Sequence, residues 1–328
     1  MTAALALAGL LAAQTPERVI FDTDPGKFTD DCVALVMCVR SPAQVALLGV
    51  TVVAGNVWAN QGIQNARSTL RVLKRTIPVH LGSQQPLVHT REMSKREAPL
   101  EFAGAFATRK PPARKETAVE FIVRTLESEP GGATILAIGP LTNVARVLTQ
   151  RPDLVGKIRR IVIMGGNVWV PGNASKAAEF NFWFDPEAAR IVLRSAIPKK
   201  ILFALDICNK AVITREVFDS VAKRRTPITL LYRDSFGNQY PAFYKDPKAT
   251  GYLWDELAAA YLIDPGFVNR SETRFLDVET AFGPRYGATL PVDAPPAPRA
   301  TPVEVMLDLD VAKVMNLYRE LLTQPDSR

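Results

Sequence analysis

Short runs of apolar, mostly β-branched residues alternate with amphipathic stretches from residue 18 to residue 205. Strands buried on both faces consist of such runs, whereas helices repeat apolar residues every three or four positions. Strands are therefore predicted at residues 18–22, 45–53, 77–80, 133–137, 158–164 and 201–205, and helices at 30–40, 59–74, 117–128, 141–148 and 186–194. This alternation is typical of an α/β protein whose mostly parallel sheet is covered by helices on both faces.

The remainder of the chain is richer in helical patterns. Helices are predicted at residues 215–223, 227–236, 252–262 and 311–322, and a strand at 275–279. We find no internal repeat and no linker-like segment that would separate a second domain. Residues 18–328 are therefore predicted to form one domain with a helical C-terminal portion.

The first 13 residues, MTAALALAGLLAA, form an apolar run that ends before Gln14. The run resembles the apolar core and cleavage end of a secretory signal, although the usual basic start is missing. Residues 1–17 are interpreted as a signal-like or disordered segment outside the fold, and an exported location (periplasmic or secreted) is favoured over a cytoplasmic one. No apolar run approaches the ~20 residues of a transmembrane helix, so no membrane partner is expected.

The charge of the chain is mildly basic. Its 328 residues include 40 Lys+Arg and 33 Asp+Glu, which gives a formal net charge of +7. The basic residues occur in short separate clusters, for example at residues 71–75, 159–160 and 223–225. Nucleic-acid binding usually needs a continuous basic stripe with aromatic residues between the charges. The excess positive charge is therefore interpreted as part of a solvated surface, and no nucleic-acid partner is expected.

Three cysteines and two histidines leave few options for catalysis. Cys32, Cys38 and Cys208 include no C-x-x-C pair and are too few for a disulfide framework. His80 and His89 cannot build a histidine-rich metal site. The chemistry of the protein must therefore rest mainly on carboxylates.

Four aspartates, Asp22, Asp24, Asp30 and Asp31, follow the first predicted strand. Ligands of parallel sheets bind outside the carboxyl ends of the strands, so this position favours a site. Asp22 and Asp24 can share a face of the strand, and one of the other two could simply cap a helix. Acids packed together raise one another's pKa values unless a cation offsets them. Oxygen-only ligands favour Ca²⁺ or Mg²⁺, and their irregular spacing favours the more flexible Ca²⁺.

Amide and carboxylate side chains follow two other predicted strands. Asn56 comes after the strand at 45–53, and Asn173, Glu179 and Asn181 come after the strand at 158–164. Amides donate and accept hydrogen bonds and carboxylates accept them from O–H groups, so the set suits a ligand with several hydroxyls. Each asparagine alone is better explained as a turn residue.

Several short motifs occur in order along the chain. They are Asp22-Thr-Asp24-Pro-Gly26 with Asp30-Asp31, Gly55-Asn56, Gly139-Pro-Leu-Thr-Asn143, Met164-Gly-Gly166, Asn173 with Glu179-Phe-Asn181, and Asp185-Pro-Glu-Ala. Together they resemble the inosine-uridine preferring nucleoside hydrolases, from about Val19 to the C-terminal helix. The resemblance implies a Rossmann-like mixed, mostly parallel sheet with helices on both faces. It also implies Ca²⁺-dependent hydrolysis of the N-glycosidic bond of ribonucleosides to ribose and free base, by a homodimer or homotetramer.

The resemblance further implies roles for individual residues. The implied Ca²⁺ ligands are Asp24, Asp31, the backbone carbonyl of Ile138, and Asp255. The residues implied to bind the ribose hydroxyls are Asp30, Asn56, Asn173, Glu179 and Asn181. Asp24 would also act as the general base that takes a proton from the attacking water beside the metal. Carboxylates suit this reaction because cleavage of an N-ribosidic bond develops positive charge on the ribose.

Two features depart from the commonest pattern of the family. Residues 27–29 make the loop between Gly26 and Asp30 longer by two residues. Trp254 precedes Asp255, where many members carry a histidine proposed to protonate the leaving base. An indole cannot supply that proton at neutral pH, but its face can stack on a purine.

Trp254 therefore implies the purine-preferring branch of the family. Trp58 and Trp183 could add further aromatic walls, but both are better interpreted as packing residues. Two other classes of function stay open at this point. A nucleoside- or ribose-binding protein would keep the site without turnover. A Mg²⁺-dependent phosphatase of the haloacid dehalogenase type shares an Asp-x-Asp after its first strand, but Gly26 stands where that pattern has Thr.

Overall fold

The computed structural model describes residues 15–89, 116–239, 246, 248 and 250–325. The signal-like segment predicted at residues 1–17 lies almost entirely outside these ranges, and the first strand begins at Glu17. Among the helices described, none is long and apolar enough to cross a membrane. Export of the chain stays a prediction.

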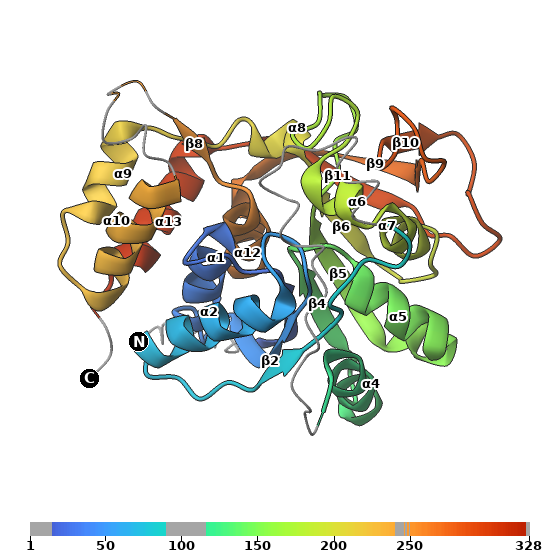
Figure 1. Cartoon of the computed structure of the whole chain (residues 1–328), viewed down its shortest axis with the longest axis horizontal. Coiled ribbons are helices and arrows are strands. Elements are labelled where there is room, and N and C mark those ends of the chain that lie inside the picture. Colours follow the sequence, from blue (N-terminus) through green and yellow to red (C-terminus); the bar gives the residue numbers. More distant parts are fainter. Residues whose placement is uncertain (1–14, 90–115, 240–245, 247, 249, 326–328) are drawn as a thin grey trace, which may run out of the picture.

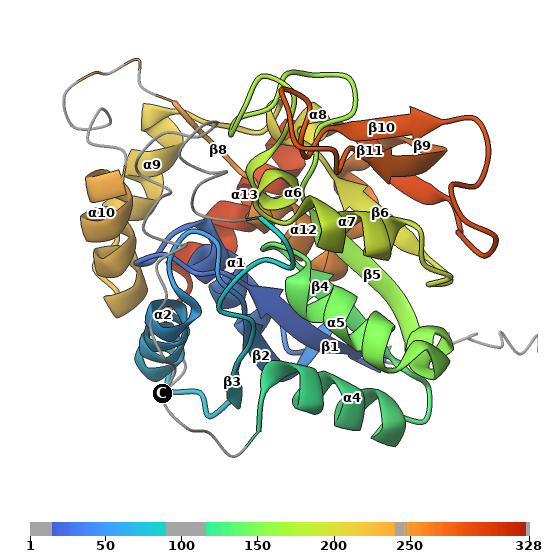
Figure 2. The ribbon, with the colours of Figure 1, turned by 45° about the vertical axis from the view of Figure 1, so that its right-hand side comes forward.

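Seven parallel strands form most of a nine-stranded sheet in the described part of the chain (Figure 1). In order across the sheet they are β11 (Val303–Leu309), β6 (Lys200–Phe203), β5 (Ile158–Met164), β4 (Ala133–Ala137), β1 (Glu17–Thr23), β2 (Val45–Val52) and β3 (Val79–Leu81). Antiparallel to β11 runs β9 (Val268–Val278), and β10 (Thr289–Val292) pairs with β9 at the edge (Figure 2). The predicted mixed, mostly parallel sheet is confirmed.

Helices cover both faces of this sheet, because successive side chains of a strand point to opposite faces. Val19 and Phe21 of β1 belong to one hydrophobic core, and Ile20 between them belongs to another. The first core includes residues of α1 (Asp30–Val39), α2 (Ala59–Val72), α12 (Asp255–Ile263) and α13 (Val311–Thr323). The second includes residues of α4 (Ala118–Ser128), α5 (Thr142–Gln150) and α7 (Pro186–Leu193). The apolar strands are thus buried between two helical layers.

Helices α1 and α12 pack against each other in the first core (Figure 1). From Asp31 to Val39 every residue of α1 is buried, and α12 is buried as far as Leu262. Helices that are this apolar all round are stable only inside a protein. Each of the two begins with a pair of acids, Asp30-Asp31 in α1 and Asp255-Glu256 in α12. The fold therefore brings four carboxylates from distant segments to the starts of two buried helices.

The order of the strands reverses beside β1. The chain passes from β1 to β2 and β3 on one side, whereas β4 joins β1 on the other side. In open α/β sheets, ligands bind outside the carboxyl ends of the strands at such a reversal. The residues that follow β1 and β4 are Asp24 and Ile138. Two of the predicted site residues therefore lie where the topology places a ligand.

The remaining described elements include two helices at one side of the molecule, two short buried helices and a small two-stranded sheet. Helices α9 (Arg215–Ala222) and α10 (Pro227–Gln239) pack with each other and with α13 at one side of the molecule (Figure 1). The short helices α6 (Phe180–Phe184) and α8 (Leu205–Cys208) follow β5 and β6, and β7 (Val212–Ile213) pairs with β8 (Gly251–Tyr252). Single 3₁₀ turns span Pro152–Lys157 and Pro265–Phe267.

The predicted elements differ most from the structure in the C-terminal part. The helix expected at 252–262 begins only at Asp255, because Tyr252 pairs with Val212 in a small sheet. The strand expected at 275–279 begins earlier, at Val268, since its polar first half pairs with β11. Strands β10 and β11 were not predicted, and β6 ends at Phe203 rather than at Leu205, where α8 begins.

Candidate functional site

Five carboxylates meet at the reversal of the sheet, and we call this group the acidic cluster. Its members are Asp24 after β1, Asp30 and Asp31 in α1, and Asp255 and Glu256 in α12. Carboxylate oxygens of Asp30, Asp31 and Asp255 lie within 4.8 Å of one another. All members except the half-buried Asp30 are buried. The structure thus brings together three of the four aspartates that follow the first strand, Asp24, Asp30 and Asp31, with Asp255, which the family resemblance implied. Asp22 lies outside the acidic cluster, and Glu256 is a member that the sequence interpretation missed.

Asp31 is held in place by four hydrogen bonds. Its Oδ1 accepts from Thr23 Oγ1 (2.5 Å) and from the backbone N–H of Asp24 (3.1 Å). Its Oδ2 accepts from Thr29 Oγ1 (3.1 Å) and from Asn56 Nδ2 (3.2 Å). All four donors are uncharged groups, so they orient the Asp31 carboxylate without neutralising it.

Asp24 is enclosed by backbone. The N–H of Asn56 donates to its Oδ2 (2.6 Å). A Cβ atom added to Gly55 would lie 2.0 Å from Asp24 Oδ2, and one added to Gly139 would lie 2.6 Å from Oδ1, so both positions need glycine. Asp24 Oδ1 is buried and has no hydrogen-bond partner. A buried oxygen without a partner needs an explanation, and a bound ligand is one.

Burial raises the pKa of every member of the acidic cluster, and for Asp24, Asp30, Asp255 and Glu256 repulsion between the carboxylates adds to that effect. The pKa of Asp30 rises to about 7, and those of Asp24, Asp255 and Glu256 rise well above the ordinary range. The pKa of Asp31 is also raised, although its hydrogen bonds oppose the effect of burial. A donor set made only of oxygen atoms, one of them without a partner, fits a hard divalent cation such as Ca²⁺ or Mg²⁺, whose charge would reverse these shifts.

Ile138, directly after β4, is hydrogen-bonded to β1 and to α6. Its N–H donates to the carbonyl of Asp22 (2.9 Å), and its carbonyl accepts from Asn181 Nδ2 (3.1 Å). The same Asn181 amide donates to the carbonyl of Met164 (3.1 Å), so it links the ends of β4 and β5. A carbonyl oxygen has two lone pairs, so Ile138 can accept a further partner.

Glu179 acts as the N-cap of α6. Its Oε1 accepts from the backbone N–H of Asn181 (2.9 Å), and its Oε2 accepts from those of Phe182 (3.2 Å) and Gly166 (2.7 Å). Burial raises the pKa of Glu179 to about 7, and these backbone donors oppose the shift. Glu179 therefore has a structural task that the sequence interpretation did not include. Its contact with ribose stays a prediction.

The loop between β5 and α6 is fixed by its own asparagines. Asn167 Oδ1 accepts from the N–H of Glu179 (2.9 Å), and Asn173 Oδ1 accepts from the N–H of Phe180 (2.9 Å). Asn173 is exposed and Asn167 is buried. The loop that carries two predicted ribose ligands is therefore held in one arrangement before any ligand binds.

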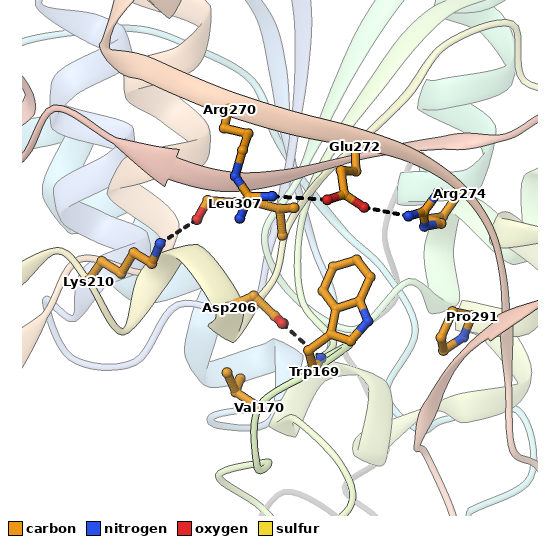
Figure 3. Close-up of a pocket in the computed structure, with 9 residues that line it drawn as sticks. All are labelled: Trp169, Val170, Asp206, Lys210, Arg270, Glu272, Arg274, Pro291 and Leu307. Atoms are coloured by element: carbon orange, nitrogen blue, oxygen red, sulfur yellow. Dashed lines mark hydrogen bonds and ion pairs between the residues drawn. The ribbon is translucent and has the colours of Figure 1, made fainter.

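A cavity of about 390 Å³ borders the same loop (Figure 3). Trp169 forms one of its walls, and Asp206 accepts from the N–H groups of Trp169 and of the residue before it, both at 2.8 Å. On β9, Glu272 accepts from Arg270 (2.9 Å) and from Arg274 (2.6 Å). None of the residues that line this cavity belongs to the acidic cluster, so the two sites are separate.

Trp254 lies directly before the acids of α12. Its half-buried ring stacks on Tyr252, with centroids 6.1 Å apart and planes inclined by 25°. The indole Nε1 is buried and has no hydrogen-bond partner. An aromatic pair beside the acidic cluster, with a free N–H, can receive a planar heterocycle.

The other two tryptophans singled out from the sequence differ in burial. Trp183 is fully buried in the first core, and the ring of His89 packs edge-on against it at 4.6 Å. This agrees with the interpretation of Trp183 as a packing residue. Trp58 is half-buried at the start of α2, two residues after Asn56.

Both histidines are engaged by residues outside the acidic cluster. His80 stacks on Phe121 at 4.1 Å, and its Nδ1 lies 3.4 Å from Glu116. His89 Nδ1 lies 3.0 Å from the carbonyl of Trp183, and burial lowers the pKa of His89 to about 4. All three cysteines are buried, and burial raises their pKa values. The contacts of the histidines and the burial of the cysteines are consistent with the prediction that the chemistry rests on carboxylates.

Asp22 belongs to a hydrogen-bond network in the core. Its Oδ1 accepts from Thr51 Oγ1 of β2 (2.5 Å) and from Asn143 Nδ2 of α5 (2.8 Å). Asn143 Oδ1 in turn accepts from the N–H of Ser83 (2.9 Å). Burial raises the pKa of Asp22 to about 7, and the two donors oppose that shift. Asp22 therefore ties β1 to β2 and α5, a role that the grouping of all four aspartates did not foresee.

Asp185 has a similar structural role in the motif Asp185-Pro-Glu-Ala. Its Oδ1 accepts from the N–H of Ala188 (3.1 Å), so it caps α7, and Pro186 occupies the first turn. Its Oδ2 accepts from Thr142 Oγ1 (2.5 Å) and from the N–H of Leu87 (2.9 Å). The motifs around residues 139–143 and 185–188 are thus connected by a buried carboxylate.

Comparisons with known proteins identify the family of the chain. Residues 19–316 match the family described as inosine-uridine preferring nucleoside hydrolase. The pyrimidine-specific ribonucleoside hydrolase RihB of Escherichia coli O1:K1 / APEC is 32% identical over 277 residues, which cover 83% of this chain and 86% of that protein. The match covers most of both chains, so the relationship is not confined to one motif.

Solved structures of the same kind are also similar. The plant nucleoside hydrolase PpNRh1 has 26% identity and a TM-score of 0.80, over 94% of this chain and 100% of that one. An inosine-guanosine nucleoside hydrolase has 27% identity and a TM-score of 0.79, over 94% of this chain and 98% of that one. With the sheet order and the acidic cluster, these matches establish that the chain belongs to the inosine-uridine preferring nucleoside hydrolase family, enzymes that hydrolyse the N-glycosyl bond of nucleosides.

Proposed function

We propose that the protein hydrolyses purine ribonucleosides to ribose and free base in a Ca²⁺-dependent reaction. The observation that carries this proposal is the acidic cluster, in which buried carboxylates repel one another and Asp24 Oδ1 has no partner. Such a site suits a hard cation and a substrate whose ribose becomes positively charged in the transition state.

The Ca²⁺ would be held by the carboxylates of Asp24, Asp31 and Asp255 and by the carbonyl of Ile138. When bound, Ca²⁺ anchors ribose hydroxyls and lowers the pKa of the neighbouring water. Asp24 Oδ1 is the proposed proton acceptor, because it alone of the two Asp24 oxygens lacks a hydrogen bond. The N–H of Asn56 holds the other oxygen, so the base stays oriented while it takes the proton.

Ribose binding is proposed for residues that follow β1, β2 and β5 at the same edge of the sheet. They are Asp30, Asn56, Asn173, Glu179 and Asn181. Asp30 is half-buried at the edge of the acidic cluster, and Asn56 and Asn173 are exposed amides. Carboxylate and amide groups can together satisfy the donors and acceptors of several hydroxyls. A ligand without the 2′-hydroxyl would leave such groups unpaired, so 2′-deoxynucleosides should be poor substrates.

The base preference is proposed from Trp254. Its stack on Tyr252 and the free Nε1 offer a face for a purine and a donor at its edge. Departure of the nucleobase then relies on stacking against Trp254 and on protonation by solvent, because Trp254 cannot act as an acid. The related E. coli enzyme is described as pyrimidine-specific, so base preference is the sharpest point to test.

A panel of inosine, adenosine, guanosine, uridine and 2′-deoxyadenosine, assayed with and without a Ca²⁺ chelator, tests the proposal. We expect purine ribonucleosides to be hydrolysed fastest and turnover to disappear with the chelator and return with added Ca²⁺. Faster hydrolysis of uridine would overturn the purine preference. Full activity in the chelator would overturn the Ca²⁺ dependence, and tight inosine binding without release of hypoxanthine would leave only a binding protein. The homodimer or homotetramer proposed for the assembly is tested by analytical ultracentrifugation.

A further inference from the structure

Glu256 is a buried carboxylate to which the reaction proposed above gives no role. It is the second residue of α12 and is 0% exposed. Its Oε2 accepts a single hydrogen bond, from the N–H of Trp254 (3.1 Å), and its Oε1 is buried without a partner. A carboxylate buried in this way is strongly unfavourable unless a charge or a donor compensates it.

The carboxylates around Glu256 make its burial still more unfavourable. The charges that act on it most strongly are those of Asp30 and Asp31, and Asp255 precedes it in the same helix turn. The start of α12 contributes only about half a positive charge. Five clustered carboxylates therefore need a much larger positive charge than the helix supplies.

We infer that Glu256 is a further carboxylate of the metal site, which acts on the bound cation through its charge and strengthens cation binding. The inference rests on the proposed Ca²⁺ site. Affinity of Ca²⁺ sites increases with the negative charge around the ion. Both carboxylate oxygens of Glu179 and of Asp185 accept hydrogen bonds that tie elements together, whereas Glu256 accepts only from Trp254, two residues earlier, and its Oε1 has no partner.

Glu256 acts from outside the ligand set. Its carboxylate is not one of those that converge at the starts of α1 and α12. The carboxylates that lie within 4.8 Å of one another are those of Asp30, Asp31 and Asp255. Glu256 thus adds charge beside the site and leaves the coordination to its neighbour.

Calorimetric titration of CaCl₂ into the full-length protein, stripped with a chelator, tests this role. The charge-removing variant is Glu256→Gln, and Glu256→Asp retains the charge. The matched control is Glu187→Gln. Glu187 is likewise an acid in the first turn of a helix, but it accepts hydrogen bonds from Tyr286 (2.9 and 3.1 Å) and lies outside the acidic cluster.

We expect Glu256→Gln to weaken Ca²⁺ binding at least tenfold and Glu256→Asp to bind within a few-fold of the unaltered protein, with Glu187→Gln unchanged. In thermal denaturation without Ca²⁺, Glu256→Gln should raise the melting temperature, since an uncompensated charge is removed. The further increase in melting temperature that Ca²⁺ produces should be smaller in this variant. Equal Ca²⁺ affinity in Glu256→Gln, or an equal loss in Glu187→Gln, overturns the inference and leaves the proposed function standing. Absence of Ca²⁺ binding by the unaltered protein overturns both.

Discussion

Two groups of buried carboxylates lie at the ends of the strands, and they differ in what surrounds them. Asp22, Glu179 and Asp185, here named the bonded carboxylates, each accept two or three hydrogen bonds from neighbouring elements. These donors oppose the rise in pKa that burial causes. In the acidic cluster, repulsion between carboxylates adds to the effect of burial for Asp24 and Asp255.

This difference indicates that the bonded carboxylates stabilise the fold and that the acidic cluster binds a ligand. A bonded carboxylate joins elements, because its removal leaves several buried donors without a partner. In the acidic cluster, Asp31 also joins elements, because it accepts four hydrogen bonds. Glu256 accepts one and faces other carboxylates, so its charge is offset only when a cation binds. Substitutions in the first group should therefore lower stability, and substitutions in the second should lower metal binding and turnover.

The largest effect is expected from Asp24→Asn. The substitution keeps the shape that fits against Gly55 and Gly139 but removes the proposed proton acceptor. Loss of a general base costs about 10²–10⁴-fold in rate, and loss of a metal ligand adds to this. We expect kcat/KM for inosine to fall at least about 10³-fold while the circular dichroism spectrum is unchanged. Inosine hydrolysis within about tenfold of the unaltered protein would show that Asp24 is not the base.

A bonded carboxylate should behave in the opposite way. Asp185→Ala removes the cap of α7 and leaves the donors of Thr142 and Leu87 without a partner. We expect the free energy of unfolding in urea to fall by about 3 kcal/mol, with Ca²⁺ affinity nearly unchanged. Asp153→Ala is the control, because Asp153 is an exposed aspartate paired with Arg151 and its loss should change stability little. A loss of Ca²⁺ affinity without a loss of stability in Asp185→Ala would show that the bonded carboxylates do not differ in role from the acidic cluster.

The sequence was sufficient for the parts of the fold that local patterns determine. Strand segments such as 161–164 and 201–203 are apolar throughout, so burial on both faces could be predicted from composition alone. Asp24, Asp30 and Asp31 lie close together in sequence, and a strand followed by a buried helix keeps them close in space. Residues that meet across the fold were predictable only through the family resemblance, as for Asp255.

Long-range partners explain what could not be predicted. The sequence contains no sign that Asp22 bonds Asn143, or that Asp185 bonds Thr142, because these contacts depend on how α5 packs on the sheet. The polar first half of β9 lacks the alternation of a half-buried strand, since it lies exposed against β11. For Glu256 a signal was present, as it directly follows Asp255 at a helix start, but its burial became visible only in the structure.

A smaller effect is expected at the edge of the acidic cluster, from Trp254→Ala. Stacking of a base on an aromatic ring is worth about 1–3 kcal/mol. We therefore expect kcat/KM for inosine to fall about tenfold to a hundredfold, and that for p-nitrophenyl riboside to change much less, because its leaving group needs neither stacking nor protonation. Trp254→Phe should recover most of the activity, because the ring face is retained. Equal losses on both substrates would show that Trp254 only supports the helix start.

The smallest effect concerns a buried charge at the opposite end of the sheet. Lys200 begins β6 and is 1% exposed, and its Nζ donates to the carbonyls of Leu193 (2.6 Å) and Ser195 (2.8 Å). Burial lowers the pKa of Lys200 from 10.5 to about 7. Between these two values the unfolded chain binds a proton that the folded chain does not, so stability rises with pH in this window. The substitution Lys200→Met should remove this dependence.

We therefore expect the free energy of unfolding of the unaltered protein, measured in urea, to rise by about 1 kcal/mol relative to Lys200→Met between pH 7 and pH 8. The carbonyl groups that accept from Lys200 are uncharged, and the residue lies at the opposite end of the sheet from the acidic cluster, so kcat/KM for inosine should be the same in both proteins at each pH. Parallel stability curves would show that Lys200 stays protonated in the fold. A pH-dependent difference in turnover would show that the charge of Lys200, at the amino end of β6, affects the reaction at the acidic cluster. Structural and functional charges could then not be assigned to separate groups.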